Sequence, residues 1–259
     1  MPEIMTTHEG AVSLPGVSMQ TWDFEANETI QTQDFNVLNS QFQQSRQGAI
    51  QWSGSCRCSL APAGALNVGP FAKLFDLAAA SDDVASAPPN LFPVGYELVL
   101  AQAVRNYIAP PAATGPAVVA SVGLKVSSTF RLLGFADPDS FPLDNTVWNK
   151  QRFNLKAWLT DSANITFDAI IQSLNARLVD GVVDVEISGR NSGDIVSSST
   201  TLIDPASLGG AATFTFASGK TVSGDILFTE VSITRDASRC DVSLRWVNKG
   251  AMTVVWGEL

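Results

Sequence analysis

The C-terminal run 211–255 constrains the fold of this chain more than any other stretch. Thr221–Arg235 alternates polar and apolar residues and is rich in β-branched side chains. Turn-forming residues interrupt the alternation at Ser218-Gly219, Asp236-Ala237-Ser238 and Lys249-Gly250. A period of two, β-branched residues and regularly spaced turns together predict an antiparallel meander.

The alternation also predicts which side chains face the core. Leu227, Val231 and Ile233 fall on one face of the segment, and Ile226 and Phe228 fall on the other. The next strand presents a one-sided row of Val242, Leu244 and Trp246.

Composition limits the function classes. The chain has 259 residues, of which 45% are hydrophobic and only 16% are charged, so we expect part of its surface to be covered by other subunits. Its net charge of −9 and the lack of Lys/Arg clusters argue against a grip on nucleic acid. We find no signal-peptide pattern and no run of about 18 apolar residues, and therefore expect no membrane span.

The pattern divides the chain into an extended arm (1–16), a first β module (17–136), a linker rich in Pro and Asp (137–152) and a second β module (153–259). Pro70 followed by an i, i+3, i+4, i+7 pattern of apolar residues predicts a short flanking helix, carried by Phe71, Leu74, Phe75 and Ala78. The segment 165–178 fits either a helix or a strand with a loop, and 189–199 is predicted as a Gly/Ser/Asn loop.

The two modules resemble each other. Shifting the chain by 136 positions places Trp22 on Trp158 and Leu38-Asn39 on Leu174-Asn175. At a spacing of 109, Gly115 meets Gly224. An internal duplication explains this order of features, although two β modules also share alternation by chance.

Two stretches resemble the tail tube proteins of tailed bacteriophages. Near the start these are Trp22-Asp23-Phe24 and the run from Gly48 to Trp52-Ser53-Gly54-Ser55; near the end it is Ser218-Gly219-Lys220-Thr221 followed by the alternating segment. The matching regions cover about 80 residues. The middle, 61–210, departs from a single-module tube protein and fits only if it holds the back of one module and the front of a second.

The resemblance implies a mainly β fold: two β-sandwich or barrel-like modules, each with a short flanking helix. It also implies a structural virion protein that polymerises as stacked rings into the tail tube through which DNA is ejected. Single-module relatives close as hexamers, so a duplicated chain would close as a trimer. Expected partners are further copies of the chain and other tail proteins such as tape measure and terminator, with assembly in the host cytoplasm and a final place in the virion tail.

The residues that could carry chemistry favour structural roles, so we expect no enzyme, no cofactor and no metal site. His8 lies in a polar arm without an orienting partner. Cys56, Cys58 and Cys240 lack the spacing and the fourth ligand of a zinc site and are predicted to be core residues. Asp137 and Asp139 lack the spacing of an EF-hand loop.

Tryptophans separate the remaining alternatives. Trp22, Trp52, Trp158 and Trp246 lie within strand patterns and are predicted to be in the core, whereas Trp148 and Trp256 are predicted at interfaces. A glycan-binding module would instead need exposed tryptophans in a flat row. Another phage β-sandwich protein, such as a decoration, tail terminator or baseplate protein, would share the strands without forming tubes.

Overall fold

The computed structural model describes residues 4–7, 11–13, 19–36, 43–60, 69, 72–80, 90–109, 117–139, 141, 152–197, 208–216 and 219–256. Within these residues the chain forms fourteen strands and no helix, so the mainly β fold class is confirmed. In chain order the strands are β1 (Ile4–Thr7), β2 (Ala11–Ser13), β3 (Met19–Asn36), β4 (Gln43–Leu60), β5 (Phe75–Ala79), β6 (Phe92–Ala109), β7 (Val118–Ala136), β8 (Arg152–Trp158), β9 (Asn164–Val179), β10 (Val182–Ser197), β11 (Gly209–Thr215), β12 (Thr221–Asp236), β13 (Cys240–Asn248) and β14 (Thr253–Val255).

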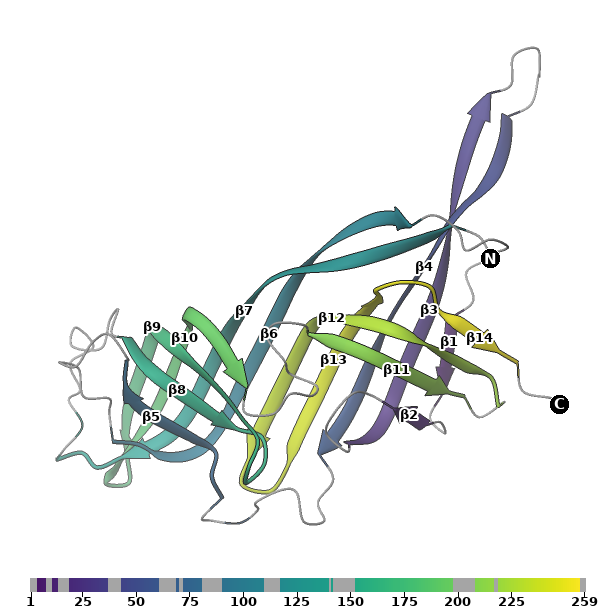
Figure 1. Cartoon of the computed structure of the whole chain (residues 1–259). Coiled ribbons are helices and arrows are strands. Elements are labelled where there is room, and N and C mark those ends of the chain that lie inside the picture. Colours follow the sequence, from purple (N-terminus) through teal and green to yellow (C-terminus); the bar gives the residue numbers. More distant parts are fainter. Residues whose placement is uncertain are drawn as a thin grey trace.

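All of these strands belong to one curved sheet (Figure 1). Its main path runs β1-β3-β4-β13-β12-β6-β7-β10-β9-β8-β5. The first part of β12 leaves this path and pairs with β11 and β14, and β11 pairs in turn with β2. This branch packs over the main sheet, because Phe214 of β11 stacks on Trp246 of β13 with ring centroids 4.8 Å apart.

Four long hairpins make up most of the sheet: β3–β4, β6–β7, β9–β10 and β12–β13. Outward from the centre, one flank contains β12, β13, β4 and β3, and the other contains β6, β7, β10 and β9. Each flank therefore consists of one hairpin next to the centre and a second hairpin outside it. At the centre, β12 and β6 pair through Glu230–Asp236 and Gly95–Ala101. On one flank β13 pairs with β4, and on the other β7 pairs with β10. Strands from the two predicted modules therefore alternate as pairs within one sheet, and the module boundaries themselves stay a prediction.

The predicted antiparallel meander is confirmed for β11, β12 and β13, and the predicted last strand is β14, which pairs with β12 and not with β13. The predicted facing of β12 is wrong. The register of β12 against β13 shifts between Phe228 and Glu230. This bulge adds one residue to β12, so Ile226 and Phe228 lie in the same buried row as Val231 and Ile233. Alternation counted along the sequence does not include such a shift.

The predicted flanking helix is also wrong. Phe75–Ala79 is strand β5, which pairs with β8, and the backbone N–H of Trp158 donates to the carbonyl of Leu74 at 2.9 Å. Leu74 and Phe75 are both buried. Pairing with β8 satisfies the backbone of this segment, and for so short an apolar run the helical spacing does not decide between helix and strand. Pro70 and Phe71 lie outside the described residues.

The segment left open between helix and strand is a strand, β9. It turns into β10 through Asp180 and Gly181, whose φ angles are 48° and 86°. Positive φ at both central residues is the geometry of the tight hairpin turn that Asp-Gly favours. The predicted loop 189–199 is wrong as well, because β10 continues to Ser197 with register shifts after Ser188 and Asn191.

Candidate functional site

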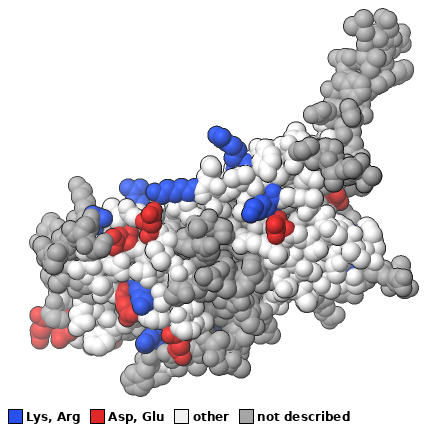
Figure 2. Space-filling model, viewed as in Figure 1, with Lys and Arg blue, Asp and Glu red and all other residues white. Residues whose placement is uncertain are grey.

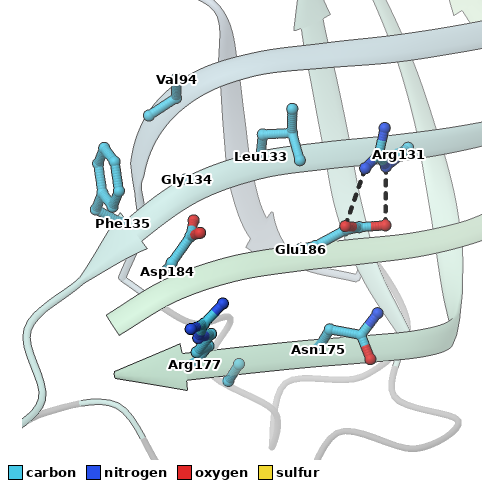
Figure 3. Close-up of a pocket in the computed structure, with 10 residues that line it drawn as sticks. Val94, Arg131, Leu133, Gly134, Phe135, Asn175, Arg177, Asp184 and Glu186 are labelled. Carbon is cyan, nitrogen blue, oxygen red and sulfur yellow. Dashed lines mark hydrogen bonds and ion pairs between the residues drawn. The ribbon is translucent and has the colours of Figure 1, made fainter. Parts of the chain in front are cut away.

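A surface hollow lies on the solvent face of the sheet, over β6, β7, β10 and β9 (Figure 3). It is a shallow depression of about 360 Å³. Its charged and polar lining comes from Arg131, Asn175, Arg177, Asp184 and Glu186, while Val94, Leu133 and Phe135 supply an apolar edge.

A bidentate ion pair crosses this hollow. Arg131 Nε donates to Glu186 Oε1 at 2.8 Å, and Arg131 Nη2 donates to Glu186 Oε2 at 3.0 Å. The hydrogen bonds from Arg131 lower the pKa of Glu186, and the same bonds raise the pKa of Arg131. Glu97 adds a longer contact to Arg131 at 3.5 Å. Both acid and base are therefore held in their charged forms, which suits a stable surface and does not suit proton transfer near neutral pH.

The hollow is one part of a wide polar face. A row of paired residues crosses β4, β13, β12, β6, β7, β10 and β9: Ser59, Asp241, Thr234, Glu97, Arg131, Ser188 and Ser173. None of these residues is buried. The adjacent row on the opposite face is buried throughout and consists of Cys58, Val242, Ile233, Leu98, Phe130, Gly189 and Ile171. One face of the sheet therefore packs into the core, and the other presents hydroxyl groups and charged side chains to solvent.

Two further ion pairs lie on the polar face. Arg245 lies 3.9 Å from Glu230, and Arg239 lies 3.2 Å from Asp241. On the side of the molecule shown in Figure 2, which is not limited to this face, basic and acidic side chains lie near each other at several places. Because these pairs are exposed, each contributes only about 0–1 kcal/mol to stability. In each pair a carboxylate balances the positive charge of the arginine, which weakens its attraction for a polyanion.

Asn248 is one of several buried polar residues that sequence reasoning missed. Its Oδ1 accepts the backbone N–H of Trp52 at 2.9 Å, and its Nδ2 donates to the carbonyls of Val119 and Gly250 at 2.8 and 2.7 Å. Asn248 has no solvent exposure. One amide therefore joins β4, β7 and the end of β13 at the place where the β6–β7 hairpin passes the other strands.

The residues weighed for chemistry do not converge on one site. Cys56, Cys58 and Cys240 are buried and form no disulfide, as predicted for core residues, and burial raises the pKa of Cys240 to about 12. Asp139 donates its backbone N–H to the Asp137 carboxylate at 3.0 Å, which forms a local turn. His8 lies outside the described residues. Among the residues that the structure describes, no group of three His, Cys, Asp or Glu could hold a metal ion.

The tryptophan predictions are confirmed in part. Trp52, Trp158 and Trp246 are buried, but Trp22 is 54% exposed, so its predicted place in the core is wrong. Trp256 is 67% exposed, and Trp148 is not described. No described segment forms a helix long and apolar enough to cross a membrane.

A scan against protein-family models gives no match for this chain, and no curated protein matches it.

Proposed function

We propose that this chain is a structural subunit that assembles into the stacked rings of a bacteriophage tail tube and performs no catalysis. The observation that carries the proposal is the polar face, which extends across seven neighbouring strands and carries hydroxyl groups and paired charges. A tube that conducts DNA needs a wide wall to which phosphates do not adhere, and a face of this kind in a protein of net charge −9 meets that need.

The order of the hairpins supports a two-module subunit. Each flank of the sheet combines a hairpin from 17–136 with one from 153–259, and the two flanks meet through equivalent strands β6 and β12. Each module would occupy one of six positions in a ring. Because one chain carries two modules, three chains would complete the ring. The partners in the virion would be further copies of this chain, together with the tape measure and terminator proteins, and DNA would pass through without specific contacts.

The glycan-binding alternative finds no support in the described tryptophans. Of the described tryptophans, Trp22 and Trp256 are exposed. Trp22 lies in β3 and Trp256 directly follows β14, and β3 and β14 are not neighbours in the sheet. They do not form the flat row that sugar stacking requires.

Electron microscopy of negatively stained, purified protein, together with light scattering for mass, tests the proposal. We expect hollow rings or tubes with three chains per ring. Six chains per ring would retain the function and contradict the two-module ring. Solid particles, or a monomer at every concentration, would contradict the tube and favour a decoration, terminator or baseplate protein.

A further inference from the structure

The β6–β7 hairpin carries exposed apolar side chains at both of its ends. β6 has 18 residues, so the two ends are separated by roughly 55–60 Å of extended chain. In Figure 1 one end lies beside the ends of β9 and β10, and the other reaches past β12 towards β4. We call the first end the base patch and the second the tip patch.

The tip patch consists of Arg105, Tyr107, Ile108, Val122, Leu124 and Lys125. Its four apolar side chains are between 49% and 59% exposed. β12 pairs with β6 only as far as Ala101, and β10 pairs with β7 only from Thr129 onward. The end of β7 is held by β4, because the Ile50 N–H donates to the Ala117 carbonyl at 2.9 Å and Ile50 pairs with Val118. Between these anchors β6 and β7 form a two-stranded ribbon, which further contacts would stabilise.

The base patch consists of Phe92, Phe135, Leu178, Val182, Asp139 and Asp184. Phe92 and Leu178 are 64% and 60% exposed. Phe92 is paired with Phe135 on the solvent face, whereas Leu178 is paired with the buried Val183 on the core face. Because apolar side chains are exposed on both faces here, the end of the sheet, and not one of its faces, is suited to a contact.

The two patches have opposite charge. The described residues 103–109 and 117–125 contain Arg105 and Lys125 and no acidic residue. Around the base patch, residues 133–139 and 175–184 contain four aspartates and a single basic residue, Arg177. Apolar surfaces of opposite charge attract each other, whereas two copies of the same patch would repel.

We propose that copies of this chain stack head to tail, with the tip patch of one copy docked on the base patch of the next. A contact between two different surfaces at opposite ends does not close on itself and extends as a filament. The proposal deepens the proposed function and rests on it for the identity of the partner, a second copy. It assigns ring-to-ring contact to this hairpin.

Charge-reversed variants test the stacking. A tip variant carries Arg105→Glu and Lys125→Glu, and a base variant carries Asp139→Lys and Asp184→Lys. We expect each variant alone to form unstacked single rings, because its two ends then have the same charge. An equimolar mixture should restore stacks in which the two variants alternate. The matched control, Arg57→Glu with Arg190→Glu, makes the same change of charge at exposed positions outside both patches and should stack like the wild type.

The readouts are stack length by electron microscopy and the urea midpoint of each variant, which confirms that it is folded. The tip variant should regain stacking in about 1 M salt, where the Debye length is about 3 Å and repulsion is screened while the apolar contact remains. Wild-type stacking by both variants, or a mixture that stays unstacked, would overturn the inference and leave the tube intact. Charge-dependent strings of chains without a hollow ring would overturn the proposed function and retain the stacking. A wild type that stays monomeric would overturn both.

Discussion

Replacement of Asn248 by aspartate tests how strongly the fold depends on one buried amide. The substitution keeps the size of the side chain and keeps an acceptor for the Trp52 N–H. It replaces the Nδ2 donor with oxygen, so that the carbonyls of Val119 and Gly250, which lie 2.8 and 2.7 Å from Nδ2, lose their donor.

The expected loss follows from those two carbonyls. A buried acceptor left unsatisfied costs about 1–3 kcal/mol, which applies in full to the Val119 carbonyl. The bond to the Gly250 carbonyl is only part-buried and adds less, so we expect a loss of roughly 2–4 kcal/mol when the aspartate is ionised. Burial raises the pKa of the aspartate above its unfolded value of about 3.9. The folded variant then binds more protons than the unfolded one, so its stability falls as pH rises above about 4 and levels off once the folded group has ionised. A protonated aspartate can still donate to one carbonyl, which limits the loss at low pH to about 1–3 kcal/mol.

Urea unfolding followed by tryptophan fluorescence from pH 4 to 8 measures both the loss and its pH dependence. Asn106→Asp is the matched control, because Asn106 is exposed and its Oδ1 accepts the Ser121 hydroxyl at 2.9 Å, a role that a carboxylate can fill. The control should stay within about 0.5 kcal/mol of the wild type. If Asn248→Asp unfolds like the control at every pH, the amide does not hold the strands together and the reasoning fails.

Three further predictions concern the core, the polar face and the thiols. Gly54→Ala should destabilise the protein by about 1–3 kcal/mol or more, since a Cβ there would clash with the Glu25 carbonyl oxygen and lie 2.7 Å from the Trp246 ring. Gly193→Ala, whose Cβ meets only a side chain at 3.9 Å, should be neutral in the same urea titration. Glu186→Gln should cost less than about 1 kcal/mol at pH 7. Because the pKa of Glu186 is lowered by its guanidinium partner, that difference should vanish as pH falls below the ordinary glutamate range, and a constant difference down to pH 3 would refute the ion pair's role. Cys240, buried and with its pKa raised to about 12, should react with a thiol reagent at pH 8 only after unfolding, and fast labelling of the folded protein would contradict its burial.

Local sequence patterns predicted the strands better than their facing. The alternation of Thr221–Arg235 was sufficient to identify β12, but the bulge between Phe228 and Glu230 depends on how β12 pairs with β13. The apolar spacing of 71–78 fits a helix in isolation, and its strand form depends on β8, which follows much later in the chain. In both segments a partner strand, absent from the local pattern, decides the structure.

Some further features can be predicted from the sequence. The Asp180-Gly181 pair favours a tight hairpin turn, and such a turn predicts that the preceding segment, 165–178, is a strand. Asn248 could not have been identified from the sequence, because its partners Trp52 and Val119 lie 196 and 129 positions away. The polar face follows from the alternation, but its continuity across seven strands depends on the order of the strands in the sheet, which a single sequence does not specify.

The interleaving of early and late strands has a consequence for the order in which the protein is made. Cys58 of β4 contacts Val242 of β13, which is 184 positions later in the chain. At about 5–20 residues per second, the ribosome needs roughly 10–40 seconds to add that stretch. During this time β3 and β4 have no neighbour on the β13 side, and distant pairings of this kind also fold slowly. A nascent chain therefore cannot complete the flank that contains β4 and β13, or join the two flanks through β12 and β6, until its last strands emerge. The assembly proposed above would therefore recruit only finished chains.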